Sequence, residues 1–333
     1  MKMKEQAIAL CIIPLFIFSF FNVGDHTKLF PEKELKCNTY SCFENKYIFL
    51  TREKGINKAF SQIKKDYLNN SIVKINCHQL THAVGRTSAE KELNLSLLFS
   101  KGDSLCFSGY YHGVMEQYLF EHNLSDLNDV CEGFGKAQSF ESYNCNHGIG
   151  HGLMYISKNE LFESLDKCNS LDQSSKRSQC YSGVFMENVL ADNKNHFTKF
   201  LNTSDIFFPC NSVEDKYKFS CYNIQTNFAY KNLKDYKKMF NACESAANYS
   251  HSCYMGIGRI IAGLHIDDLN KIKANCELGN NIEKKNNCIF GAVRVLVLFY
   301  SDDKEAKRFC DIISDKSKPQ CKNYLKFISS SLN

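Results

Sequence analysis

Cysteines recur in pairs along most of this chain, and their spacing limits the possible fold more than any other feature. The pairs are Cys131 and Cys145, Cys168 and Cys180, Cys210 and Cys221, Cys243 and Cys253, Cys276 and Cys288, and Cys310 and Cys321. The interval between second members runs from 32 residues (Cys221 to Cys253) to 41 residues (Cys180 to Cys221), a period typical of helical-hairpin repeats. The spacing therefore predicts repeated helix pairs, each closed by a disulfide.

The segments around each pair have the polarity of two different helices. Segments that lead to a first cysteine carry apolar residues at helical spacing, and we call them A helices: residues 161–168, 233–243, 266–276 and 302–310. More apolar segments begin with Cys-x-x-Gly, and we call them B helices: residues 106–119, 145–156, 180–190, 253–263 and 288–299. Glycine inside a helix costs about 1 kcal/mol relative to alanine, so its recurrence indicates that neighbouring B helices pack closely.

The predicted fold is all-α, with disulfide-stapled helical-hairpin repeats forming an α-solenoid. In period and cysteine placement, residues 55–328 resemble the disulfide-stapled members of the Sel1-like and tetratricopeptide class of helical solenoids. The Cys-x-x-Gly opening departs from the residue consensus of those families, and a likeness of architecture implies no activity. The first units are irregular, so we expect Cys77 to pair with Cys106 between units and Cys37 with Cys42 in a local loop. A weak A-helix pattern at residues 192–209 predicts a kink or a longer loop there.

The N-terminus predicts export. Lys2 and Lys4 precede an uninterrupted apolar run at residues 7–21, which is typical of a signal peptide or an uncleaved membrane anchor, assigned to residues 1–24. An N-terminal extension, residues 25–54, is expected to separate it from the repeats. Of 17 cysteines, all but Cys11 follow this segment, and an even number in an exported chain favours disulfides. The expected location is extracytoplasmic, either secreted or held at the membrane by the N-terminal segment.

Two further features concern the location and the partners of the chain. Asn-x-Ser/Thr triplets of the kind that accept glycans occur at Asn69, Asn94, Asn123, Asn202 and Asn248. The net charge of +5 over 333 residues is too small and dispersed to indicate a nucleic-acid partner.

Polar residues recur at one position of the apolar B helices. The sixth residue after the B-helix cysteine is, in successive units, His112, His151, Met186, Asn227, Arg259 and Arg294, and His82 is the fifth after its cysteine. In solenoids the inner helices line the concave binding surface. We therefore expect these side chains to lie along one face, where Arg259 and Arg294 are candidates for binding an anion.

The N-terminal part of this face contains a pattern typical of metal sites. Histidines or a histidine and a glutamate stand four residues apart on three consecutive B helices, which places each pair on one helix face. The expected ligands are His82, His112, Glu116, His151 and Glu187, with His78 and His147 at the edge of the site. Imidazole and carboxylate ligands suit a divalent transition metal, zinc or copper. Proton transfer by the same groups is an open alternative, so the pattern leaves catalysis undecided.

Several other site classes are excluded. The chain has no Cys-x-x-Cys-His motif for covalent haem and no phosphate loop or dinucleotide fingerprint, so neither haem nor a nucleotide is expected. A second function class stays open, in which the histidines are structural and the repeats bind a protein or glycan on their concave face. The partner is then an unknown protein or a small ligand, with the membrane added if the N-terminal segment is retained.

Overall fold

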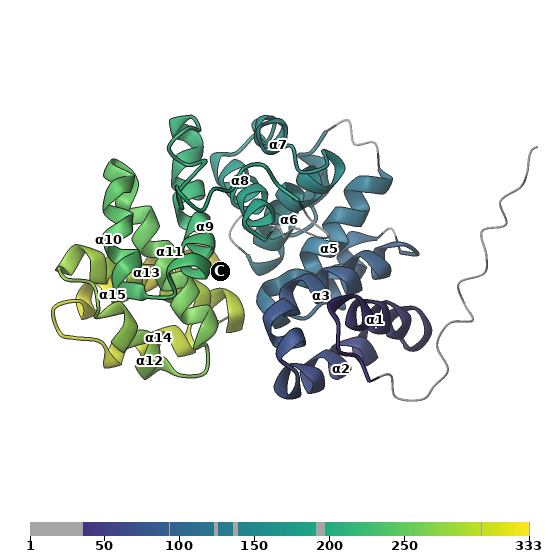
Figure 1. The fold of residues 1–333 in the computed structure, drawn as a ribbon, viewed down its shortest axis with the longest axis horizontal. Coiled ribbons are helices and arrows are strands. Elements are labelled where there is room, and N and C mark those ends of the chain that lie inside the picture. The colour runs from purple at the N-terminus through teal and green to yellow at the C-terminus, as the bar shows by residue number, and fades with distance from the viewer. Residues whose placement is uncertain are drawn as a thin grey trace, which may run out of the picture. The chain divides into compact units, whose positions relative to one another are not determined.

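Helices are the only regular secondary structure in the part of the chain that a computed structural model describes, residues 36–92, 94–122, 126–135, 139–190, 197–300 and 302–332 (Figure 1). The chain divides into two units, Met1–Cys37 and Asn38–Asn333, and every described helix belongs to the second. The expected signal peptide or anchor, residues 1–24, lies outside the described residues. Among the described helices, none has the length and apolarity needed to cross a bilayer.

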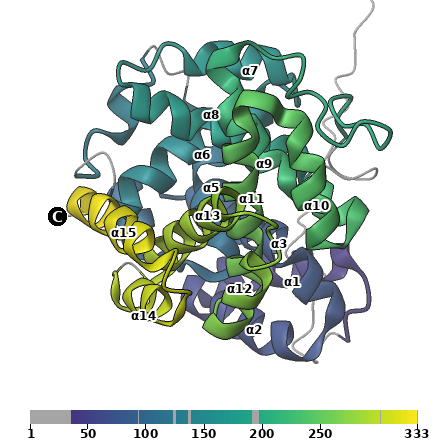
Figure 2. The same cartoon turned by 90° about the vertical axis from the view of Figure 1, so that its left-hand side faces the viewer.

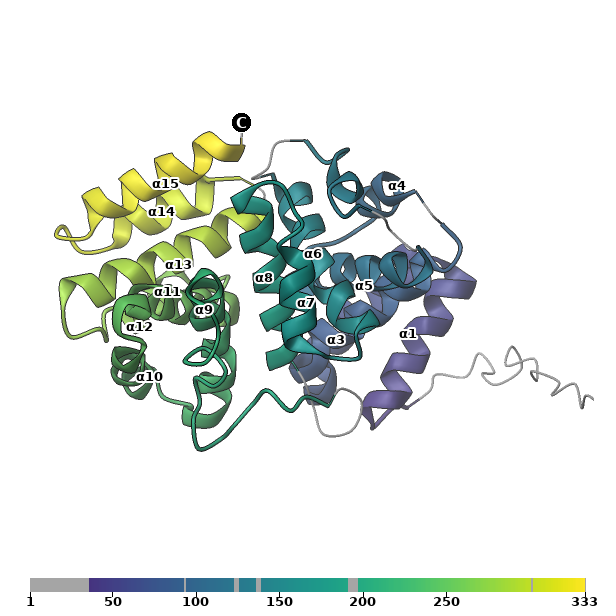
Figure 3. The same ribbon diagram turned by 90° about the horizontal axis from the view of Figure 1, so that it is seen from above.

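The long buried helices follow one another as the B-helix pattern predicts. They are α3 (Ser71–Ala89), α5 (Leu105–Glu121), α6 (Phe140–Ile156), α8 (Ser174–Val189), α9 (Asp215–Leu233), α11 (Ser250–Leu264), α13 (Ile282–Tyr300) and α15 (Lys318–Leu332). Each packs against the next in chain order (Figure 3). Except for α5, which begins at Leu105 just before Cys106, they begin three to six residues before the expected cysteine, because preceding residues add up to two turns. Ser139, for example, caps α6 by accepting a hydrogen bond from the backbone N–H of Ser142.

Shorter elements precede the first B helix and connect the others. They are α2 (Ile56–Asn69), α4 (Leu95–Ser100), η2 (Asp129–Cys131), α7 (Leu161–Cys168), α10 (Tyr236–Ala242), η3 (Cys243–Tyr249), α12 (Leu269–Cys276) and α14 (Lys304–Ile312). In α7, Leu161, Leu165 and Cys168 lie on one face and are all buried. Turns replace an A helix at residues 201–213, in the region of weak pattern. The segment expected to be an extension contributes α1 (Tyr40–Lys54), which packs against α2 and α3.

Disulfides join the helices at the positions that the cysteine spacing indicates. The bridges are Cys77–Cys106, Cys131–Cys145, Cys168–Cys180, Cys210–Cys221, Cys243–Cys253, Cys276–Cys288 and Cys310–Cys321, and Cys37 and Cys42 are also disulfide-bonded. Six of the bridges close short segments ahead of a B helix, whereas Cys77–Cys106 connects two B helices, α3 and α5. This content of disulfides indicates an oxidising, extracytoplasmic compartment.

Glycines let adjacent B helices approach backbone to backbone. A Cβ atom on Gly183 of α8 would lie 1.9 Å from the carbonyl oxygen of His147 in α6, and one on Gly150 of α6 would lie 2.1 Å from the carbonyl oxygen of Cys180. The pair α11 and α13 has the same reciprocal arrangement at Gly258 and Gly291. These contacts are the packing reason for the recurrent glycines, and they bring side chains of neighbouring B helices within reach of one another.

Helices far apart in the sequence also meet. The Ser104 hydroxyl, just before α5, donates to the carbonyl oxygen of Phe299 in α13 at 3.5 Å, and the guanidinium of Arg294 in α13 lies 5.3 Å from the ring centre of Tyr143 in α6. The path of the chain thus brings α11 and α13 close to α5 and α6, so that residues of all four helices line one cavity (Figure 2).

Candidate metal centre

Three consecutive B helices, α3, α5 and α6, bring five histidines together. We call His78, His82, His112, His147 and His151 the histidine cluster. The ring centres of His112 and His151 lie 4.3 Å apart, and that of His82 lies 5.4 Å from His112 and 5.3 Å from His151. The three histidines expected to converge are therefore in mutual contact, because the glycine-mediated packing of their helices leaves no room for intervening side chains.

The cluster contains two equivalent halves, one on α3 and one on α6. In the first, His78 Nε2 lies 3.0 Å from His82 Nε2. In the second, His147 Nε2 lies 3.2 Å from His151 Nε2. Spacing of four residues on a helix produces both contacts. His78 and His147, expected at the edge of the site, are thus full members of it.

The outer nitrogen of each histidine in the two halves has a hydrogen-bond acceptor. His82 Nδ1 lies 2.6 Å from Glu116 Oε1, and His151 Nδ1 lies 2.5 Å from Glu187 Oε2. His78 Nδ1 lies 2.7 Å from the carbonyl oxygen of Cys106, which can only accept. Carboxylates and carbonyls therefore place the hydrogen of these three imidazoles on Nδ1.

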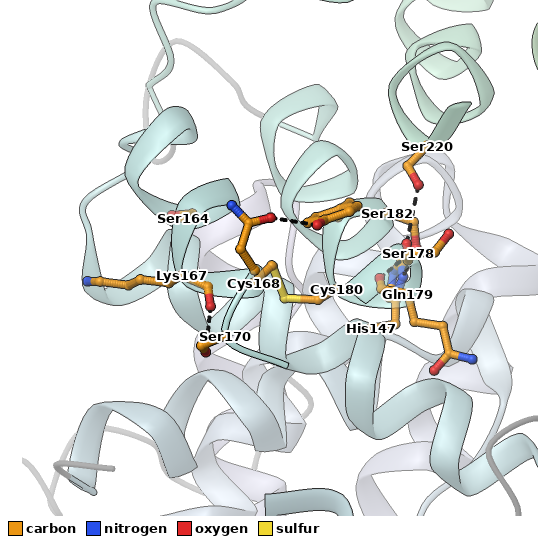
Figure 4. The surroundings of a disulfide bond; sticks show 12 residues. His147, Ser164, Lys167, Cys168, Ser170, Ser178, Gln179, Cys180, Ser182 and Ser220 are labelled. Atoms are coloured by element: carbon orange, nitrogen blue, oxygen red, sulfur yellow. Dashed lines mark hydrogen bonds between the residues drawn. A yellow bond between two sulfur atoms is a disulfide. The ribbon is translucent and has the colours of Figure 1, made fainter. Parts of the chain in front are cut away.

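The fourth acceptor is a hydroxyl, and its own hydrogen is already used. Ser182 Oγ donates to the carbonyl oxygen of Gln179 at 2.7 Å, so it accepts from His147 Nδ1, also at 2.7 Å. Figure 4 shows His147 beside Ser182 near the Cys168–Cys180 bridge. All four histidines of the two halves therefore direct unprotonated Nε2 atoms at each other.

Unprotonated nitrogens at these distances repel unless a cation lies between them. Burial, reinforced by neighbouring histidines, lowers the pKa of His78 to about 3. Burial is also the main cause that lowers the pKa of His147 and of His151, so in the α6 half a proton is a poor occupant. Two imidazole nitrogens bound to one ion at 2.0–2.1 Å in tetrahedral geometry lie about 3.3 Å apart, close to the separations in both halves.

His112 lies between the halves. Its side chain is 2% exposed, and its Nδ1 atom is buried without a hydrogen-bond partner among the described residues. Burial first, and then the nearby histidines, lower its pKa well below the ordinary value. His112 belongs to two groups that could hold a metal ion. One consists of His78, His82 and His112, the other of His112, His147 and His151, and in each group the ligand atoms lie within 4.8 Å of one another.

The two glutamates expected as ligands lie at the same site. With His82 and His151 they form a third group whose ligand atoms are within 4.8 Å of one another. Burial alone would raise the pKa of Glu116, but His82 and Arg86 outweigh it and lower that pKa. Arg86 Nη1 donates to Glu116 Oε2 at 2.6 Å, so this carboxylate stays charged in a buried position.

Sequence reasoning missed two supporting residues. Arg86 follows His82 by four positions on α3, a spacing that places both on one face and could have identified it. Ser182 gave no such signal, because only the packing of α8 on α6 places it at His147.

The two candidate anion-binding residues reach the same region. Arg259 of α11 lines a cavity together with His112 and His147, and Arg294 of α13 lines an adjoining hollow. The positive charges of both arginines contribute, after burial and neighbouring histidines, to lowering the pKa of His147.

Comparison with models of known protein families, with curated proteins and with solved structures found no match for this chain. No family model therefore identifies it with the Sel1-like or tetratricopeptide repeats. Independently of any relative, the described residues form an all-α protein whose helices are joined by disulfides and which encloses a buried histidine and glutamate group able to hold a metal ion.

Proposed function

We propose that this protein is an exported metalloprotein whose histidine cluster holds a transition-metal ion. The observation that carries the proposal is the orientation of the four paired imidazoles, in which acceptors hold the Nδ1 hydrogens and the Nε2 lone pairs face each other at 3.0 and 3.2 Å. A divalent cation converts this repulsion into coordination. Neutral imidazole is the ligand form, and burial favours that form.

The donor set favours zinc or copper. Imidazole suits both ions, whereas magnesium and calcium prefer oxygen ligands. Glu116 and Glu187 act on the outer nitrogens of His82 and His151, an arrangement that orients metal-binding imidazoles and increases their basicity. In this proposal the ion is bound by the histidine cluster, and the two carboxylates hold ligands in place.

The proposal extends to architecture and location. Packing of each B helix on the next supports an α-solenoid, wound tightly enough for α11 and α13 to reach α5 and α6. The disulfides and the apolar segment at residues 7–21 support an extracytoplasmic protein, secreted or anchored at the membrane.

Metal analysis tests the proposal. Protein produced in an oxidising compartment should contain zinc or copper by mass spectrometry, lose it to a chelator, and take it up again. His112→Ala and His151→Ala should each abolish uptake. His265→Ala is the matched control, since His265 lies at the end of α11 outside the cluster.

Circular dichroism must show that the variants keep their helices. Folded wild-type protein that binds neither zinc nor copper overturns the proposal. That result would favour the alternative in which the histidines are structural and the repeats bind a protein or glycan.

A further inference from the structure

A cavity of about 90 Å³ lies on the inner side of α5 and α6, next to the histidine cluster. Helices α11 and α13 form its opposite wall. We call it the inner pocket, and its lining includes Phe107, His112, Phe140, His147, Arg259 and Leu298. His112 and His147 belong to both the cluster and the lining of the pocket, so this pocket is a route by which a small molecule can reach the cluster.

The inner pocket is positively charged. Burial lowers the pKa of Arg259 to about 10, which leaves the guanidinium protonated at neutral pH. No Asp or Glu occurs among the described residues that line the pocket or the adjoining hollow. The second arginine, Arg294, interacts with Tyr143 and Tyr324 and adds its charge from that hollow.

The guanidinium of Arg259 is also incompletely hydrogen-bonded. Its Nε atom is buried and has no partner among the described residues, and Nη2 donates to the carbonyl oxygen of Asn223 at 3.3 Å. A buried charge without a counter-ion is unfavourable. Arginine presents its donors in a planar fork that matches a carboxylate or a phosphate. An oxyanion would supply the missing partner.

The walls of the inner pocket distinguish between these anions. Phe107, Phe140 and Leu298, together with Val295 and Phe299, form an apolar lining. Inorganic phosphate has no surface to bury there, whereas a short organic acid has an apolar body attached to its charged group. Burial of that body contributes binding free energy in proportion to its apolar area.

We propose that the inner pocket binds a small organic carboxylate, with the carboxylate on Arg259 and the apolar body against Phe107, Phe140 and Leu298. The molecule then lies beside His112 and His147. That it is the substrate or ligand of the metal centre rests on the function proposed above, whereas its binding to the pocket does not.

Calorimetric titration of the full chain with butyrate and with inorganic phosphate tests this proposal. We expect butyrate to bind to the chelated protein and to the zinc-loaded protein. Arg259→Gln should weaken butyrate binding at least tenfold, while Arg308→Gln, which removes an exposed arginine paired with Glu305, should leave it unchanged. Metal content, measured on the same samples, should be equal in the two variants.

A second variant keeps the test valid if Arg259→Gln does not fold. Leu298→Phe fills the apolar part of the pocket without changing its charge, and it should abolish butyrate binding. Absence of butyrate binding, unchanged binding in either pocket variant, or tighter binding of phosphate than of butyrate overturns the proposal. Because metal uptake is measured separately, wild-type protein that binds butyrate but takes up neither zinc nor copper would refute only the proposed function. Protein that takes up metal but does not bind butyrate would refute only this inference.

Discussion

Replacing Glu187 by glutamine should weaken metal binding without unfolding the protein. The carboxylate of Glu187 lies 2.5 Å from His151 Nδ1, and its side chain is 5% exposed. Glutamine retains an oxygen that can accept the Nδ1 hydrogen, but it loses the negative charge that increases the basicity of Nε2. The perturbation therefore reaches the metal through His151, whose Nδ1 hydrogen this carboxylate accepts.

Two magnitudes follow from this geometry. Loss of an outer-shell partner of a metal-binding histidine typically lowers affinity 10- to 100-fold, equivalent to about 1.4 to 2.8 kcal/mol. Exchanging a charged hydrogen bond for a neutral one should reduce the free energy of unfolding by about 1 kcal/mol. Metal affinity is thus expected to change more than stability.

Glu116→Gln provides a contrast, because Glu116 also forms an ion pair with Arg86. This change also removes the nearer of the two counter-ions of Arg86, which lies 2.6 Å from Nη1, and leaves Glu44 at 3.7 Å. Removing one partner of a buried ion pair lowers the free energy of unfolding by about 3 to 5 kcal/mol. Because the Arg86 side chain is 27% exposed, we expect the lower end of this range, about 3 kcal/mol. Metal affinity and stability should both fall.

Competition for zinc against a chromogenic chelator measures the affinities, and denaturant unfolding of the chelated proteins measures the stabilities. Glu160→Gln is the control, since Glu160 forms an exposed ion pair with Lys199 and its loss should change neither quantity appreciably. Wild-type zinc affinity in Glu187→Gln would refute the role assigned to this carboxylate.

Three further outcomes are expected. The metal-free protein should lose stability as the pH falls from about 6.5, the ordinary value for histidine, towards the value of about 3 to which burial lowers the pKa of His78. The unfolded chain binds protons there that the folded chain does not, so thermal unfolding temperatures that stay constant over this range would contradict the burial argument. Gly183→Ala should lower the free energy of unfolding by about 1 to 3 kcal/mol through overpacking and abolish metal uptake, because its Cβ would lie 1.9 Å from a carbonyl oxygen of α6. Gly133→Ala is the control: its Cβ would have only one atom nearby, at 3.8 Å, so neither thermal unfolding nor metal uptake should change. Non-reducing peptide mapping should recover the six bridges that close segments of 10 to 14 residues, each contributing about 3 kcal/mol, and free thiols there in native protein would contradict the structure.

The cysteine pairs and the polarity of the flanking segments were sufficient to predict an all-α protein with disulfide-linked helices. These signals are local, because a bridge such as Cys243–Cys253 closes a short segment and helical periodicity depends only on nearby residues. The same register placed His112 and His151 at equivalent positions and predicted their approach. The exact starts of the B helices were not predicted, since the turns before each cysteine depend on capping and packing.

The chemistry of the site depended on contacts between helices. No spacing in the sequence indicates that Ser182 accepts from His147, or that the Cys106 carbonyl accepts from His78, yet these contacts orient the Nε2 atoms toward one another. Likewise, Arg259 lies over 100 positions beyond His147, and only the return of α11 and α13 to α5 and α6 brings both into one cavity. Local sequence determines which face of a helix a side chain occupies. Which helix faces meet is decided only by the tertiary structure, because the path of the chain depends on the sum of many packing contacts along its length.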